Sequence, residues 1–172
     1  SSNPAVQLDL GGYAKGRALD DAVAILKKHG VKNALVNIGG NVIALGTHGD
    51  RPWRVGIQHP RQPGTLATLD LHDGEAVGTS GDYQRYFEAE GKRYCHLIDP
   101  RSGSPASGMQ SVTVLVSGEH AGTRSDALSK PLFIDGAAQL AQHAVRLGVA
   151  DYLAVDSNGK VHVSPAMKAR LR

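Results

Sequence analysis

Cysteine is almost absent from this sequence, since Cys95 is the only one among 172 residues. A single thiol excludes an internal disulfide and a cysteine-rich zinc site. Aromatic residues are also scarce, at 5% of the chain. No run approaches the roughly 18 consecutive apolar residues that a membrane-spanning helix needs. With 41% hydrophobic and 20% charged residues, the composition is that of a globular chain that buries a sizeable core.

A strong excess of one charge is missing as well. The formal net charge is only +3, and lysine and arginine are scattered along the chain. Nucleic-acid-binding proteins usually carry a basic stripe interleaved with aromatic residues, and no such stripe is present. We therefore expect no nucleic-acid partner, whereas a phosphorylated small molecule would need far fewer positive charges.

Glycine, in contrast, is abundant, with 21 residues. Such a composition indicates tight turns and short strands, and consecutive strands with short links favour antiparallel pairing. Neither a linker nor a repeat interrupts the sequence. We therefore predict an α+β fold and a single domain over residues 1–172.

Apolar spacing predicts a helix over residues 13–29, with Gly30 as its stop. Other helical segments are expected around 125–128, where Pro131 should interrupt the helix, and at 137–147. Hairpins are expected at Glu90-Gly91-Lys92 and at Asn158-Gly159. Strands are predicted at 34–38, 41–45, 53–57, 66–71, 75–79, 86–89, 93–98 and 111–116.

Five short motifs combine glycine or small residues with polar side chains. They are DLGGYAKG (9–16), NIGGN (37–41), GTSGDYQRYF (78–87), HLIDPRSGSP (96–105) and SDALSK (125–130). A turn explains any one glycine pair by itself, because glycine readily adopts positive φ. None of the motifs is a Walker loop or a dinucleotide fingerprint.

Taken in order, the five motifs resemble those of the FAD:protein FMN transferases, the ApbE flavin transferases. The resemblance covers essentially the whole chain and matches the C-terminal half of a family member, so the N-terminal part is expected to be absent here. It implies a T-fold-like architecture in which helices pack on one face of an antiparallel sheet.

The resemblance also implies a reaction. FAD is cleaved at its pyrophosphate, FMN passes to a threonine or serine hydroxyl of a target flavoprotein, and AMP leaves. Such in-line phosphoryl transfer needs a base near the hydroxyl and positive charge at the pyrophosphate, which magnesium commonly supplies. The family further implies the periplasmic side of the bacterial inner membrane, with membrane contact only through a possible N-terminal lipid anchor absent from this chain.

Carried over residue by residue, the resemblance assigns catalytic roles to His96 and Asp126, and makes Asp126 and Ser129 the expected magnesium ligands. An ordinary histidine pKa of about 6.5 suits proton transfer from a hydroxyl at neutral pH. The expected FAD-contacting residues are Asp9, Gly12, Lys15, Thr79, Ser80, Gly81 and Ile98.

Lys130 departs from the family pattern, which usually has threonine four residues after the aspartate. A protonated lysine only donates hydrogen bonds and is no metal ligand. Either Ser129 or a main-chain carbonyl completes a weaker magnesium site with Asp126, or the Lys130 ammonium takes the cation position and touches phosphate. The second hypothesis gives a non-catalytic flavin-binding module, and a half-domain that needs a partner segment is a further alternative.

Overall fold

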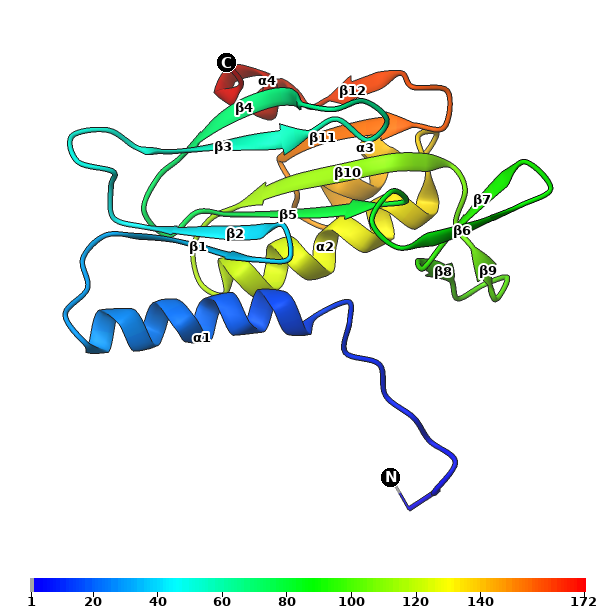
Figure 1. Ribbon diagram of the computed structural model, residues 1–172, viewed down its shortest axis with the longest axis horizontal. Coiled ribbons are helices and arrows are strands. Elements are labelled where there is room, and N and C mark those ends of the chain that lie inside the picture. Colours follow the sequence, from blue (N-terminus) through cyan, green and yellow to red (C-terminus); the bar gives the residue numbers. More distant parts are fainter. Residues whose placement is uncertain (1) are drawn as a thin grey trace.

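The computed structural model describes residues 2–172 and is built around a six-stranded sheet with the order β1-β2-β5-β10-β11-β12 (Figure 1). Every neighbouring pair in this sheet is antiparallel. The strands are β1 (Ala34–Ile38), β2 (Asn41–Leu45), β5 (Ala76–Gly81), β10 (Met109–Val116), β11 (Asp151–Asp156) and β12 (Val161–Val163). The predicted α+β class with an antiparallel sheet is confirmed.

Helices α1 (Ala14–Lys28), α2 (Ala121–Asp135) and α3 (Leu140–Arg146) cover one face of the sheet. Their apolar side chains form one buried cluster with alternate residues of the strands, as the period of two along a strand requires. The resemblance led us to expect helices on one face of the sheet, and α1, α2 and α3 lie together on this one. The short helix α4 (Pro165–Arg170) is different, because its Met167 belongs to the cluster on the opposite face.

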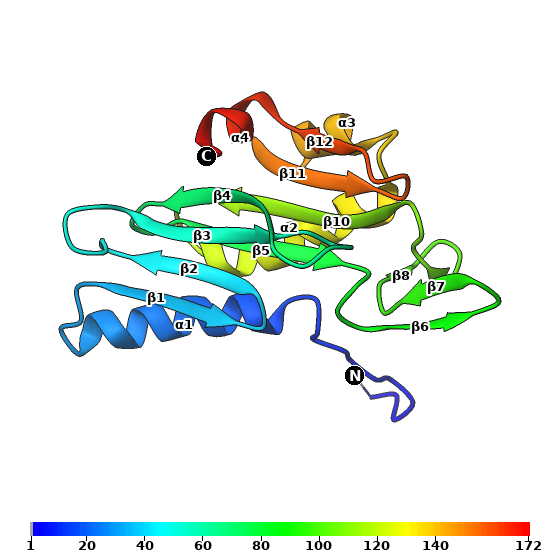
Figure 2. The ribbon, with the colours of Figure 1, turned by 45° about the horizontal axis from the view of Figure 1, so that its top comes forward.

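That opposite face is covered mainly by a hairpin of β3 (Trp53–Gln58) and β4 (Thr65–Leu71). Two smaller hairpins, β6 (Tyr86–Ala89) with β7 (Lys92–Cys95) and β8 (Ile98–Asp99) with β9 (Ser104–Pro105), extend from one end of the sheet. The chain leading into α1 lies at this same end (Figure 2). The hairpins predicted at residues 90–92 and 158–159 are confirmed.

The predicted break at Pro131 is wrong, because α2 runs through it without interruption. Proline removes its own N–H and its ring crowds the carbonyl four residues earlier, but the residues that follow it, Leu132 and Phe133, are fully buried in the core. Tertiary packing therefore outweighs the local preference. The helix also begins earlier than predicted, because the Asp20 side chain accepts hydrogen bonds from the free N–H groups of its first turn, those of Gly122 and Thr123.

Within residues 2–172, no helix combines the length and the apolar character needed to cross a membrane.

Candidate functional site

A cavity of about 730 Å³ opens at the end of the sheet where the five motifs meet. Its walls come from the turn before α1, the end of β5, the segment between β7 and β8, and α2. The residues predicted to contact FAD all line it: Asp9, Gly12, Lys15, Thr79, Ser80, Gly81 and Ile98. His96 and Lys130 line it too, whereas Asp126 and Ser129 lie fully buried.

Helices α1 and α2 cross at two glycines that allow their backbones to touch. A Cβ atom at Gly16 would lie 2.3 Å from the Gly122 carbonyl oxygen, and one at Gly122 would lie 2.6 Å from the Gly16 oxygen. This close crossing lets the Gly16 N–H donate to Asp126 Oδ2 at 2.9 Å. Gly16, the last residue of the DLGGYAKG motif, therefore holds one carboxylate oxygen of the buried Asp126 in place.

The other side of Asp126 is engaged by Lys130. Lys130 Nζ donates to Asp126 Oδ1 at 2.6 Å and to the Asp126 carbonyl oxygen at 2.7 Å. Burial by itself raises the pKa of the Asp126 carboxyl, but the hydrogen bonds from Lys130 and Gly16 outweigh it, so the pKa is lower than usual. Burial also lowers the pKa of the Lys130 amine, and the hydrogen bond to Asp126 opposes that effect, so the two groups stabilise each other's charged forms.

The Ser129 hydroxyl is engaged by two neighbouring groups. Its Oγ donates to the Asp126 carbonyl oxygen at 2.9 Å and lies 2.8 Å from Ser80 Oγ. Because the Ser129 proton is used on the carbonyl, the Ser80 hydroxyl acts as donor to Ser129. Within residues 2–172 there is also no group of three or more histidine, cysteine or acidic side chains that could hold a metal. These oxygens do not fit a divalent cation.

The two glycine pairs make room for two lysine side chains. A Cβ atom at Gly12 would lie 3.2 Å from Lys130 Cδ, and one at Gly39 would lie 3.3 Å from Lys15 Cδ. Gly39 also has a φ of +57°, which disfavours larger residues. The two glycine pairs therefore leave space for the aliphatic parts of both lysine side chains at the cavity wall.

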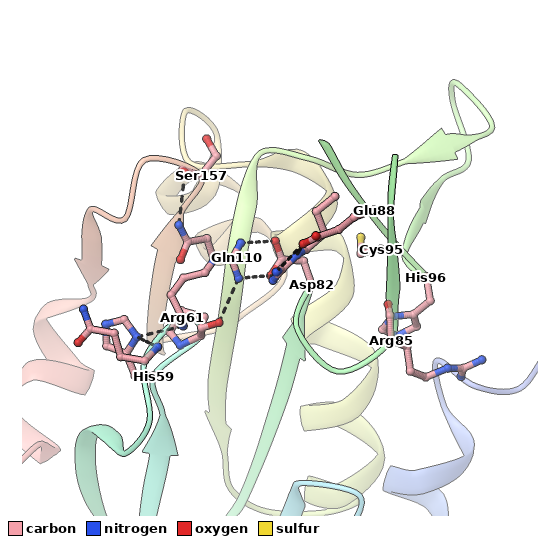
Figure 3. Close-up of polar contacts among 12 residues, drawn as sticks. His59, Arg61, Asp82, Arg85, Glu88, Cys95, His96, Gln110 and Ser157 are labelled. Atoms are coloured by element: carbon pink, nitrogen blue, oxygen red, sulfur yellow. Dashed lines mark hydrogen bonds and ion pairs between the residues drawn. The ribbon is translucent and has the colours of Figure 1, made fainter. Parts of the chain in front are cut away.

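His96 lies in the connection between β7 and β8, beside Arg85 (Figure 3). Its Nδ1 is 3.1 Å from the Arg85 carbonyl oxygen. A carbonyl only accepts, so Nδ1 carries the proton and Nε2 remains an acceptor. The pKa of the imidazole is lowered: partial burial has the largest effect, the hydrogen bond to the Arg85 carbonyl opposes it, and the positive charges of Arg85, Lys15 and Lys130 lower the pKa further. A neutral imidazole with a free acceptor nitrogen can take a proton at neutral pH.

One residue of the cavity wall and one ion pair beside it were not predicted. Arg85 lines the cavity and adds a cation to its wall. Asp82 accepts two hydrogen bonds from Arg61, at 2.7 and 2.6 Å, which tie the loop between β3 and β4 to the end of β5 (Figure 3). Arg85 and Asp82 stand inside the GTSGDYQRYF motif, which could have suggested them, but Arg61 lies outside every motif.

Comparison with known proteins agrees with the motifs. A model of the ApbE family matches residues 1–153. An FAD:protein FMN transferase from Rhodobacter capsulatus is 46% identical over 171 residues, which cover 99% of this chain and 32% of that protein. Another, from Escherichia coli K12, is 32% identical over 174 residues, which cover 98% of this chain and 48% of that protein.

Solved structures show the same likeness. The ApbE protein of Thermotoga maritima aligns with a TM-score of 0.88 and 36% identity, covering 97% of this chain and 54% of that one. The apo form of the flavinyl transferase ApbE from Pseudomonas stutzeri aligns with a TM-score of 0.79 and 36% identity, covering 95% and 51%. This chain spans about a third to a half of the length of these relatives. The family match and the likeness in both sequence and structure show that the chain belongs to the ApbE family.

Proposed function

We propose that this protein transfers FMN from FAD to a threonine or serine hydroxyl of a target flavoprotein and releases AMP. One observation carries the proposal: all seven residues expected to contact FAD, together with His96, line a single cavity. Relatives named FAD:protein FMN transferase support the same reaction. Because this chain spans only part of their length, the reaction of the whole protein remains a proposal.

The positive charges of the cavity suit a pyrophosphate. Lys15, Arg85 and Lys130 all line the cavity, and Lys130 is already paired with Asp126. Lysine and arginine stabilise phosphate oxygens by charge-assisted hydrogen bonds, which strengthen in a partly desolvated site. Asp9 has a structural role in the same wall. Its Oδ1 accepts a hydrogen bond from the Gly11 N–H at 2.7 Å and so stabilises the turn at the first glycine pair.

His96 is the proposed base. Its Nε2 takes the proton from the acceptor hydroxyl as the hydroxyl oxygen attacks the phosphorus atom of the FMN half. The bond from this phosphorus to the bridging oxygen breaks, and AMP leaves with the electron pair. The Arg85 carbonyl holds Nδ1–H at 3.1 Å and so keeps the ring in the required tautomer.

The family resemblance implies magnesium on Asp126 and Ser129, whereas the oxygens of these two residues in this protein do not fit a divalent cation. The oxygens of these two residues are engaged by Lys130, Gly16 and Ser80. The steps proposed above therefore use only the side chains of this protein.

A non-catalytic flavin-binding module is the second candidate, and the Asp126–Lys130 pair favours it because the pair removes the expected metal position. Both candidates predict that the full-length protein binds FAD, measured as a change in flavin fluorescence. Only transfer predicts AMP, which chromatography detects after incubation with FAD and a flavoprotein domain that carries an exposed threonine. FAD binding without AMP release would favour the binding module, and no binding at all would overturn both candidates.

The periplasmic side of the bacterial inner membrane is the proposed location, and it rests on the family resemblance alone. Fractionation of cells that express the full-length protein tests it. Recovery in the periplasmic or membrane fraction would support the proposal, and recovery with the cytoplasm would contradict it.

A further inference from the structure

The Lys130 ammonium occupies a position that suits a cation. It lies 2.6 Å from one Asp126 carboxylate oxygen and 2.7 Å from the carbonyl oxygen of the same residue. Magnesium binds such oxygens at about 2.0–2.1 Å and requires nearly octahedral geometry. An ammonium group and a magnesium ion cannot share the position between these two oxygens, since they would overlap and repel.

The Lys130 side chain is held in this position. Only 17% of it is exposed, and a Cβ atom at Gly12 would lie only 3.2 Å from its Cδ and 3.3 Å from its Cε, so a larger residue at position 12 would crowd it. Asp126 is itself held from the other side by the Gly16 N–H and is fully buried. The ammonium is therefore part of an arrangement that includes both helices.

The ammonium keeps one donor for a ligand. Lysine carries three N–H donors. Two of them are directed at the oxygens of Asp126, and the residue lines the cavity in which the predicted FAD-contacting residues meet. The third donor is therefore available on the cavity side, where it can reach a phosphate oxygen.

Resting on the proposed function, we infer that Lys130 is a built-in cation that binds the pyrophosphate of FAD and replaces a divalent metal at Asp126. The charge balance differs from that of a metal site. Magnesium beside one carboxylate leaves a net charge of about +1, whereas the ammonium beside Asp126 leaves about zero. Lys15 and Arg85 then supply the net positive charge of the cavity.

Two variants of the full-length protein, Lys130→Thr and Lys130→Met, distinguish an ammonium cation from a divalent metal at Asp126. Threonine offers an oxygen beside Asp126, while methionine removes the ammonium and offers no hard ligand. Binding of Mn²⁺, a paramagnetic substitute for Mg²⁺, is measured by electron paramagnetic resonance without FAD. FAD affinity is then measured by flavin fluorescence in Mg²⁺ and in EDTA.

The unmodified protein should bind no Mn²⁺, and its FAD affinity should be the same in Mg²⁺ and in EDTA. Lys130→Thr should bind Mn²⁺ and bind FAD more tightly in Mg²⁺. Lys130→Met should lose about tenfold or more in FAD affinity, because hydrogen bonds to charged groups are among the stronger ones, and Mg²⁺ should not restore it. Lys130→Met leaves the buried Asp126 carboxylate without its positive partner, which can destabilise the fold. The double variant Asp126→Asn/Lys130→Met removes the negative charge of Asp126 as well and serves as the comparison for FAD binding.

Binding of Mn²⁺ to the unmodified protein, or a loss of its FAD affinity in EDTA, would overturn the inference. So would a folded Lys130→Met variant that binds FAD as tightly as the parent. The Mn²⁺ titration does not depend on flavin chemistry. If FAD failed to bind under every condition, the proposed function would fall, while Mn²⁺ would still report whether Lys130 excludes a metal.

Discussion

Replacing Gly16 by alanine should destabilise the protein, even though alanine is the better helix former by about 1 kcal/mol. The new methyl group would lie 2.3 Å from the Gly122 carbonyl oxygen and 2.7 Å from both Thr123 Cα and Asp126 Cβ. These atoms belong to the backbone of α2 or to the base of a buried side chain. Helices α1 and α2 must therefore move apart, and overpacking of this kind costs about 1–3 kcal/mol.

Separation of the helices also weakens the 2.9 Å hydrogen bond from the Gly16 N–H to Asp126. A hydrogen bond to a charged group contributes about 1.5–3 kcal/mol. After the gain in helix propensity is subtracted, the free energy of unfolding should fall by roughly 1.5–5 kcal/mol. Helix propensity alone predicts the opposite sign, so the outcome separates the two explanations.

Urea unfolding followed by circular dichroism measures this difference. Gly108→Ala is the matched control, because a methyl group there would lie 3.5 Å from Gly136 Cα, an ordinary contact. The control should stay within about 0.5 kcal/mol of the parent. A Gly16→Ala variant as stable as the parent, or more stable, would refute the tight crossing of α1 and α2.

Three other outcomes are expected. His96→Asn should slow FMN transfer about 10²–10⁴-fold and leave FAD affinity nearly unchanged, as the loss of a base requires; equal losses of rate and affinity would make His96 a packing residue. Because the pKa of His96 is lowered and the neutral ring is the active form, the transfer rate should persist as pH falls through about 6.5 and decline only below it; a decline centred at or above that pH would contradict this. Arg61→Ala should lower the free energy of unfolding by about 1–3 kcal/mol, because the largely buried Asp82 carboxylate loses both short hydrogen bonds and keeps only the longer contact with Arg93 at 4.0 Å. Arg17→Ala removes an exposed ion pair and should cost less than about 0.5 kcal/mol. Thermal unfolding of the two variants compares them, and equal stability would show that the Arg61 pair contributes nothing.

Local chemistry made much of the fold predictable. Gly91 and Gly159, the glycines of the two predicted turns, adopt positive φ, and both hairpins are present. The motifs were also predictable as a group, since the residues expected to contact FAD line one cavity. Short-range preferences and an ordered set of motifs were sufficient for these features.

Contacts between distant segments were not predictable in the same way. Asp20 caps α2 from 102 residues away, and Arg61 pairs with Asp82 across 21 residues. Pro131 stays inside a helix because the adjacent residues are buried, which the local sequence does not reveal. The pairing of Lys130 with Asp126 was one of two open hypotheses, because spacing alone could not show which oxygens the ammonium would reach.

The most direct test of the proposed function is the intact mass of an acceptor. The full-length protein, FAD and a flavoprotein domain with an exposed threonine are incubated together, and the domain is weighed by mass spectrometry. We expect the domain to gain the mass of one FMN group, with AMP formed in equal amount, and to gain far less with the His96→Asn variant. An acceptor that keeps its original mass, while its established transferase modifies it under the same conditions, would contradict the assignment of this protein as an FMN transferase.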